Sequence, residues 1–231
     1  MKYKYETHCH TKYSSACSRF EAEEIVKMYL TNGYSGVCIT DHFLNGNCTV
    51  NKKMPDASYE EKIRDFCEGY KQVKKAAEGT DLQVFFGVEY SYKGTDILIY
   101  GLDEEALINF PEIMDMKTSE LCTKLNGSDV LAVQAHPFRE AGYIDHVRIF
   151  GTVEGIEVYN SSREPICNKL GEFYANETGK LKIGGSDSHS PLQPKLSGMQ
   201  FDTKANDIFE LISLIRSGKG EIIDMENQYK G

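Results

Sequence analysis

The segment GVCITDH, residues 36–42, joins an uncharged run of β-forming residues to a carboxylate and an imidazole. The run at residues 36–40 is typical of a strand buried on both faces of a parallel sheet. Asp41 and His42 follow it directly, at the carboxyl end of a strand, where the active sites of α/β barrels are assembled. Taken alone, this pair is better explained by a turn in which Asp41 caps the next segment, so the rest of the chain must decide.

The same pattern recurs along the chain. Further strands are predicted at residues 82–88, 96–101, 130–135, 155–159 and 181–184, with an extended run at 2–6. Segments of helical periodicity lie at residues 22–32, 58–78, 118–125, 164–176 and 207–217, and Gly33 and Gly218 stand where C-terminal caps belong. This alternation predicts an α/β fold with a parallel sheet, one domain over residues 1–231, closed into a TIM-like βα barrel of seven or eight units. An open doubly wound sheet is the alternative, although the chain has no GxGxxG or P-loop motif.

The composition is that of an ordinary globular protein, since 40% of the 231 residues are apolar and 26% are charged. A net charge of −9 repels nucleic-acid phosphates and anionic lipids, which disfavours a nucleic acid polymer or a membrane as partner. The seven cysteines form no CxxC pair and the N-terminus has no apolar signal segment, so a reducing cytoplasm is the expected location. No heptad pattern indicates an oligomeric state.

Histidines concentrate at the ends of the predicted strands. Five of the six lie at or just beyond such an end, and the sixth, His146, is interpreted as a surface residue. His8 and His10 stand two residues apart on an extended chain, which turns both imidazoles to one side and lets them chelate one ion. Asp187 and His189 follow the strand at 181–184 with the same spacing, so they can serve one ion or two neighbouring ions.

Two carboxylates and one His-Arg segment extend this set. Glu89 directly follows the apolar run 82–88, and a carboxylate there is costly unless it is solvated, paired or bound to metal; its two oxygens suit a bridge between cations. Asp96, which begins the next strand, is either a further oxygen ligand or a simple strand-start residue. In the segment AHPFR, His136 offers a ligand nitrogen, and Arg139 offers either a planar fork for phosphate or a solvated surface guanidinium.

Each fragment is ambiguous alone, but together they place every candidate ligand at one end of successive strands. Chance does not readily produce five such elements. The sequence therefore predicts a metal site of several ions, and imidazole with carboxylate favours zinc, iron or manganese over calcium or magnesium. No site for an organic cofactor is predicted.

In these motifs the chain resembles the PHP (polymerase and histidinol phosphatase) family. The resemblance runs through nearly the whole sequence in the order HCHT, TDHF, GVEYS, AHPFR, GIEVYN and GSDSH. It implies a distorted seven-stranded βα barrel, commonly with a trinuclear metal centre, and in many members hydrolysis of phosphate esters. It also implies three metal positions: one at His8, His10, Glu89 and Asp187, a second at His136 bridged by Glu89, and a third at His42 and His189.

The chain departs from the family pattern at two points. Members commonly carry Asp or His shortly after the HxH motif, whereas residues 11–18 here read TKYSSACS, so that Ser15 or Cys17 would have to take that place. The third ion is then weakly held, absent or thiolate-bound. Asp96 stands where a His usually precedes the strand, and its oxygen shifts the preference of the second ion slightly towards manganese or iron.

The function expected from these residues is that of a histidinol-phosphatase-like phosphoesterase. Two or three divalent ions would activate a water that hydrolyses a small phosphorylated substrate, with Arg139 stabilising the charge on phosphate. Asp41 or His189 would handle protons. One alternative is a metal-dependent hydrolase of an amide or cyclic substrate, because a metal-activated water does not choose phosphorus over carbon. The other is a non-catalytic metal-binding module. The sequence names neither the substrate nor the proton donor to the leaving group.

Overall fold

The computed structural model describes residues 2–50, 54–142, 144 and 149–231 of the chain. The elements in chain order are β1 (Tyr3–Cys9), α1 (Ala22–Thr31), β2 (Gly36–Ile39), α2 (Tyr59–Phe66), α3 (Glu68–Ala76), β3 (Gln83–Tyr92), β4 (Thr95–Tyr100), α4 (Glu104–Ile108), the 3₁₀ helix η2 (Pro111–Asp115), α5 (Thr118–Leu125), β5 (Leu131–Gln134), β6 (Gly155–Asn160), α6 (Pro165–Thr178), β7 (Leu181–Gly185), β8 (Lys195–Phe201), α7 (Ile208–Arg216) and β9 (Glu221–Glu226). Each strand and helix predicted from the sequence has a counterpart in this list.

The described residues form one sheet of nine strands in the order β7-β6-β5-β4-β3-β2-β1-β8-β9. Beyond β7, a parallel bridge joins Ser188 to Cys9 of β1, with hydrogen bonds from His10 N to Ser188 O (2.9 Å) and from Ser188 N to His8 O (3.1 Å). This contact brings the two ends of the run β1 to β7 together, so the sheet is a nearly closed, barrel-like one. The α/β class is therefore confirmed, whereas the predicted number of seven strands is wrong.

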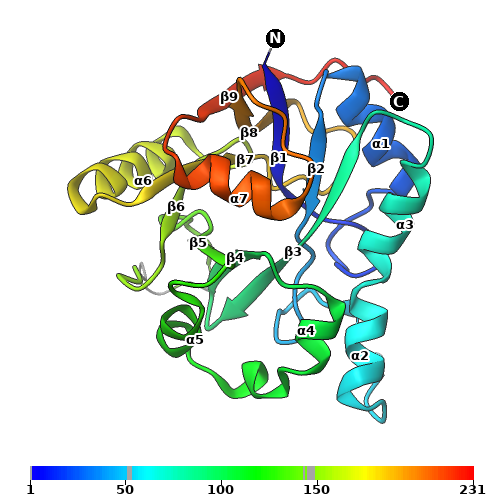
Figure 1. Ribbon diagram of the computed structural model, residues 1–231, viewed down its shortest axis with the longest axis vertical. Coiled ribbons are helices and arrows are strands. Elements are labelled where there is room, and N and C mark those ends of the chain that lie inside the picture. The colour runs from blue at the N-terminus through cyan, green and yellow to red at the C-terminus, as the bar shows by residue number, and fades with distance from the viewer. Residues whose placement is uncertain (1, 51–53, 143, 145–148) are drawn as a thin grey trace.

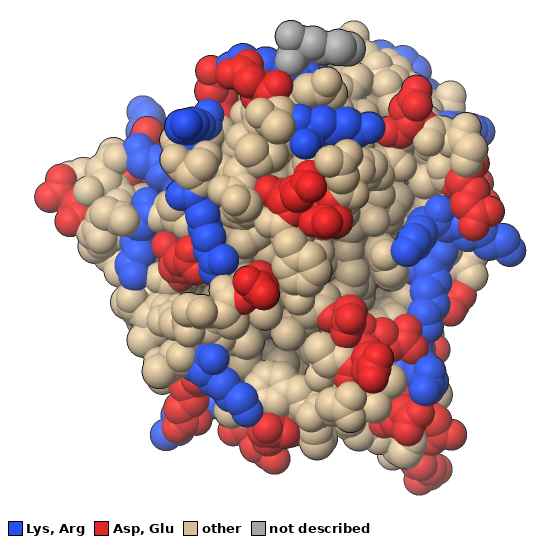
Figure 2. Space-filling view, viewed as in Figure 1, with Lys and Arg blue, Asp and Glu red and all other residues tan. Residues whose placement is uncertain are grey.

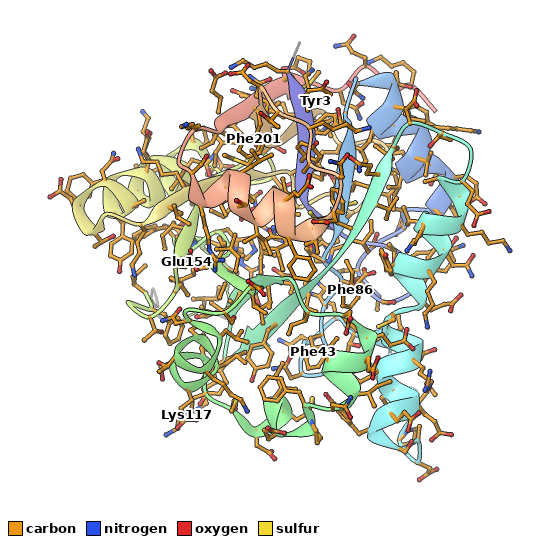
Figure 3. The ribbon with its side chains drawn as sticks, in the orientation of Figure 1. Tyr3, Phe43, Phe86, Lys117, Glu154 and Phe201 are labelled. Atoms are coloured by element: carbon orange, nitrogen blue, oxygen red, sulfur yellow. The ribbon has the colours of Figure 1, made fainter. Side chains whose placement is uncertain are left out.

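The two additional strands are β8, which pairs antiparallel with β1, and β9, which pairs antiparallel with β8 at the edge of the sheet. Tyr3 of β1 pairs with Phe201 of β8, and the two side chains are seen together where the strands meet (Figure 3). Gly198 lies inside β8 with a φ of 135°, and a Cβ at this position would collide with the carbonyl oxygen of Tyr5. Glycine in a strand interior weakens the sequence signal for a strand, which is why β8 was not predicted.

The sheet is also less parallel than the alternation of elements predicted. β3 and β4 form an antiparallel hairpin, and β4 is again antiparallel to β5. The hairpin turns at Lys93 and Gly94, whose φ values of 50° and 84° are those of a two-residue type I′ turn. As a result β3 continues to Tyr92, and Glu89 lies inside the strand, paired with Leu98, rather than after its end.

The helix predicted at residues 58–78 is two helices that meet at Cys67. Ser14 enters the helical ladder at this point, because its Oγ donates to Phe66 O (2.8 Å) and accepts from Gly69 N (3.2 Å). A side chain that takes ladder groups in this way breaks or bends a helix. The break places the start of α3 against the segment that follows β1.

The helices cover the sheet on its outer sides. Figure 1 shows α1 and α3 together beside β2 and β3, α6 at the opposite side of the molecule, and α7 across β7 and β1 in the foreground. No helix among the described residues is both long and apolar enough to cross a membrane. On the face seen in Figure 2, acidic and basic side chains are interspersed, without a continuous basic surface over the part of the chain that is drawn there.

Candidate metal centre

His8 and His10 lie fully buried at the carboxyl end of β1, facing two carboxylates from other strands. His8 Nε2 is 3.3 Å from Glu89 Oε1 and 3.6 Å from Asp187 Oδ1. His10 Nε2 is 3.4 Å from Glu89 Oε2 and 3.4 Å from the same oxygen of Asp187. The four side chains that the sequence assigned to one ion therefore converge, although they come from β1, β3 and the segment after β7.

His136, which follows β5, approaches the same carboxylates from the other side. Its Nε2 is 3.5 Å from Glu89 Oε1, 3.8 Å from Asp187 Oδ2 and 4.0 Å from Asp96 Oδ2. Asp96 is the second residue of β4, yet it lies at the same end of the sheet as the other groups because β4 runs antiparallel to its neighbours. Glu89 thus stands between two groups of donors, which is the position of a bridging carboxylate.

Two further imidazoles lie at the rim of this cluster. His42 Nδ1 is 2.6 Å from Glu89 Oε2, and the His42 and His189 rings stack on His10 with centroids 4.4 and 4.3 Å away. Donor atoms of these three histidines all lie within 4.8 Å of one another. His42 and His189 are also the more open pair, with 16% and 29% of their side chains exposed.

Two buried nitrogen atoms without hydrogen-bond partners in the described part of the chain indicate that this cluster fits divalent cations. His8 Nε2 and His10 Nε2 are buried and have no hydrogen-bond partner among the described residues. Each such atom costs about 1–3 kcal/mol unless something else compensates it. Both nitrogens point at carboxylate oxygens that can share a cation, and mixed nitrogen and oxygen donors suit zinc, manganese or iron.

Backbone strain marks the same place. His136 and Asp187 have φ values of 26° and 53°, and among the described residues Lys93 is the one other non-glycine residue with a positive φ. A residue in this region costs on the order of 1–3 kcal/mol and persists where the surrounding structure holds it. Two of the three strained residues are candidate ligands.

A second layer of side chains orients these imidazoles. Glu157 Oε1 lies 2.9 Å from His8 Nδ1, and Ser15 Oγ lies 3.2 Å from His10 Nδ1. The carbonyl of Asp187 lies 2.9 Å from His189 Nδ1. With Nδ1 engaged in each case, Nε2 is the nitrogen left for the centre.

Asp41 belongs to this supporting layer and does not line the cavity. One carboxylate oxygen accepts from Thr11 N (2.7 Å) and Ser15 Oγ (2.6 Å), and the other accepts from Thr11 Oγ1 (2.8 Å). Burial raises the pKa of Asp41 to about 6, against the effect of these hydrogen bonds. The residue expected to handle protons is therefore placed where it holds the segment after β1, including the partner of His10.

The cluster forms the floor of a cavity of about 270 Å³. Two guanidinium groups line it, and each contacts a candidate ligand: Arg139 Nη2 lies 3.6 Å from Asp96 Oδ2, and Arg163 Nη2 hydrogen-bonds Asp187 Oδ2. Arg163 was missed from the sequence, as was Glu157. Their positions were a signal that the residues are unusual, because Glu157 is a carboxylate within the predicted apolar strand 155–159 and Arg163 follows that strand just before a helix, but this signal does not show which partner either would meet.

Mutual charges dominate the electrostatics of the centre. Burial by itself would lower the pKa of His8, but Asp187, Glu157 and Glu89 outweigh it and hold that pKa well above its usual value. Burial would likewise raise the pKa of Glu89 and Asp187, and the neighbouring imidazoles hold both well below the usual range. The same carboxylates that favour a proton on His8 would favour a cation in its place, so the two compete for this site.

Two cysteines lie at the rim of the site: Cys17, which the sequence offered for the place after the HxH motif, and Cys48, which it did not. Burial raises the pKa of Cys17, but hydrogen bonds with His189 and His42 outweigh it and bring the pKa to about 6. Cys48 lines the cavity beside it. His146, interpreted from the sequence as a surface residue, lies outside the described residues.

Comparisons with known proteins agree on the fold. The family model described as PHP domain matches residues 6–212. A comparison with curated proteins gave no match. A two-domain protein from Bacteroides vulgatus, described as containing a predicted PHP-like metal-dependent phosphoesterase, has a TM-score of 0.65 at 14% identity. The alignment covers 96% of this chain but only 65% of that protein.

Two further solved structures match over most of both chains. PsfC from Pseudomonas syringae has a TM-score of 0.65 at 15% identity, over 97% of this chain and 92% of its own. An amidohydrolase from Chromobacterium violaceum with bound sulfate has a TM-score of 0.55 at 15% identity, over 96% of this chain and 98% of its own. At these identities the likeness establishes a shared fold.

Proposed function

Because the chain belongs to the PHP domain family, we propose that it is a metal-dependent hydrolase whose substrate is a small phosphate ester. The observation that carries the proposal is the convergence of the buried, unpartnered nitrogens of His8 and His10 on Glu89 and Asp187, next to two guanidinium groups. Ligands for metal and a binding site for an oxyanion thus share one cavity.

We assign the candidate ligands to two or three ions of zinc, manganese or iron. His8, His10, Glu89 and Asp187 would hold one ion. Glu89 would bridge to a second ion at His136 and Asp96, since these three side chains bring donor atoms within 4.8 Å of one another. His42, which faces Glu89 at 2.6 Å, would hold a third. Such ions, when bound, supply the Lewis acidity that polarises a phosphoryl oxygen and acidifies water.

The phosphate preference rests on the two arginines. Guanidinium forks match phosphate oxygens in pairs and keep their charge at every working pH. Arg139 and Arg163 contact Asp96 and Asp187 on the cavity wall, so they are held at the edge of the cluster, where the equatorial oxygens of a bound phosphoryl group would lie. They would stabilise the negative charge that grows on these oxygens.

His189 is the group proposed to pass a proton to the leaving oxygen. It is the more exposed of the two rim imidazoles, and it lines the cavity. Burial lowers its pKa, but hydrogen bonding with Cys17 and the charge of Asp187 outweigh this and raise the pKa above its usual value. A protonated imidazole at the mouth of the cavity is a suitable general acid.

The test is a hydrolysis assay on the purified protein with added Mn²⁺ or Zn²⁺. The substrates are p-nitrophenyl phosphate, a panel of phosphomonoesters, and N-acyl and cyclic compounds. We expect metal-dependent release of phosphate that is lost in the variant carrying both His8→Ala and Asp187→Ala. Turnover of N-acyl or cyclic compounds alone would favour the amide or cyclic hydrolase. No turnover above the variant, with one ion or none per chain by mass spectrometry, would favour a non-catalytic module.

A further inference from the structure

Two cysteines from different loops meet at the rim of the centre. Cys17 lies in the loop after β1 and Cys48 in the loop after β2, and the ends of both strands lead into the centre. A short antiparallel contact fixes the loops together, through the bridge between Ser15 and Thr49 and the hydrogen bond from Ala16 N to Cys48 O (2.6 Å). The backbone therefore holds the two loops side by side and keeps the two cysteines close to each other.

The sulfur atoms of Cys17 and Cys48 and a ring nitrogen of His42 all lie within 4.8 Å of one another. In a tetrahedral zinc site with Zn–S bonds of about 2.3 Å, two sulfurs are about 3.8 Å apart. A contraction of at most about 1 Å, through rotation of these side chains, would bring the three donors to this geometry. His42 also faces Glu89 at 2.6 Å, so this group adjoins the carboxylate that links the other two sites.

We propose that the third ion of the centre is held by Cys17, Cys48 and His42 in a soft, sulfur-rich site that selects zinc. The proposal rests on the metal centre proposed above and names the ligands of its outermost ion. Thiolates select zinc over manganese, whereas the deeper sites, built from carboxylate and imidazole, accept both. The centre is then a mixed one, with a zinc position at the rim and less selective positions beneath it.

This assignment also accounts for the sequence between residues 11 and 18. The chain carries no acidic or imidazole side chain there, and Cys17 supplies a donor from that segment. It leaves His189 outside the three-ligand group, available for the proton transfer proposed for it. Three protein ligands leave a fourth tetrahedral position open to the cavity, as in zinc sites that take part in catalysis.

The experiment compares the wild-type protein with the double variant carrying Cys17→Ser and Cys48→Ser. The matched control is Cys167→Ser, a partly buried cysteine at the start of α6 that does not line the cavity. Each protein is stripped with chelator and titrated with Co²⁺, and then loaded with equimolar Zn²⁺ and Mn²⁺ for mass spectrometry. Thermal melting of the three proteins checks that they are folded.

We expect the near-ultraviolet sulfur-to-cobalt charge-transfer band in the wild type and in the control, and its loss in the double variant. Zinc content should fall by about one ion per chain in the double variant, with manganese retained at the deeper sites. Absence of the band from wild type, or equal zinc content in all three proteins, would overturn the thiolate site. This readout is independent of turnover: the band without hydrolysis would refute only the phosphoesterase proposal.

Discussion

Replacing Glu157 by glutamine tests whether the second layer of the centre controls metal affinity. Glu157 Oε1 lies 2.9 Å from His8 Nδ1, and Oε2 accepts from His136 N (2.9 Å) and Asn160 Nδ2 (3.0 Å). Every partner of this carboxylate is a donor when His8 presents Nε2 to a metal. The side chain is also buried, so water cannot replace a lost partner.

The amide of Glu157→Gln cannot satisfy these partners in either orientation. With its NH₂ group towards His8, it faces Nδ1–H or forces the proton onto Nε2, the nitrogen needed for the metal. With the NH₂ group turned the other way, it faces the N–H of His136 and the amide of Asn160. At least one buried donor loses its acceptor in each orientation, at about 1–3 kcal/mol, which corresponds to about 5- to 150-fold weaker metal binding.

The assay is competition of stripped protein against a chromophoric chelator for Zn²⁺ and Mn²⁺. The control is Glu154→Gln, the same change at the residue before β6, where Glu154 accepts from Arg216 at 2.7 and 2.8 Å on the surface. We expect the control to bind metal as the wild type does. If Glu157→Gln also binds both ions with wild-type affinity and remains folded, the argument that Glu157 orients His8 is wrong.

Three further changes test separate parts of the structure. Gly69→Ala should lower the free energy of unfolding by about 1–3 kcal/mol, because the new Cβ collides with the Asp41 carboxylate. Gly171→Ala is also inside a helix but has its nearest neighbour at 3.4 Å, so it should raise the free energy of unfolding by about 1 kcal/mol. Urea denaturation measures both, and a change of the same sign in the two variants would refute the steric argument. Burial raises the pKa of Glu6 to about 7. The folded protein then keeps a proton that the unfolded chain loses above about pH 4.5, so stability falls as pH rises towards 7. With chelator present, the stability of Glu6→Gln relative to that of the wild type should increase by about 2–3 kcal/mol between pH 5 and pH 8, as measured by urea denaturation. The same pH dependence of stability in both proteins would contradict this. Arg163→Gln should lower kcat/KM for phosphomonoesters about 10- to 100-fold at saturating metal, and unchanged kinetics would remove Arg163 from phosphate binding.

The clustering of the candidate residues was predicted better than the sheet. His8, His136 and Asp187 were each singled out at the end of an apolar run, because a strand that carries its polar group at one end places that group at one edge of the sheet; Glu89 was singled out in the same way, although β3 continues beyond it. The rule is local, so it survives errors in topology. Asp96 is an exception: at the start of a parallel strand it would lie at the opposite edge, and it reaches the cluster because β4 is antiparallel to both neighbours.

The residues missed are those whose role depends on a distant partner. Glu157 and His8 are 149 residues apart, and no periodicity within β6 shows which side chain it will meet. Cys48 is brought near Cys17 by the backbone bridge between Ser15 and Thr49, which joins two loops that share no pattern in the sequence. Arg163 was overlooked because a single arginine before a helix is more often a solvated one. The roles of Glu157, Cys48 and Arg163 depend on tertiary packing, which is determined by the whole sequence and not by a local pattern.

One part of the second layer was nevertheless within reach of sequence reasoning. The alternation that turns His8 and His10 to one side of an extended chain also turns Glu6 to that side. In the structure Glu6 Oε1 accepts from the backbone N–H of His8 (2.9 Å) and of Ser186 (2.9 Å), and Oε2 accepts from the Tyr29 hydroxyl (2.9 Å). Glu6 therefore ties β1 to the segment that carries Asp187. The motif at this strand is thus Glu-x-His-x-His: its first residue joins β1 to the segment after β7, and its histidines face the carboxylates of Glu89 and Asp187.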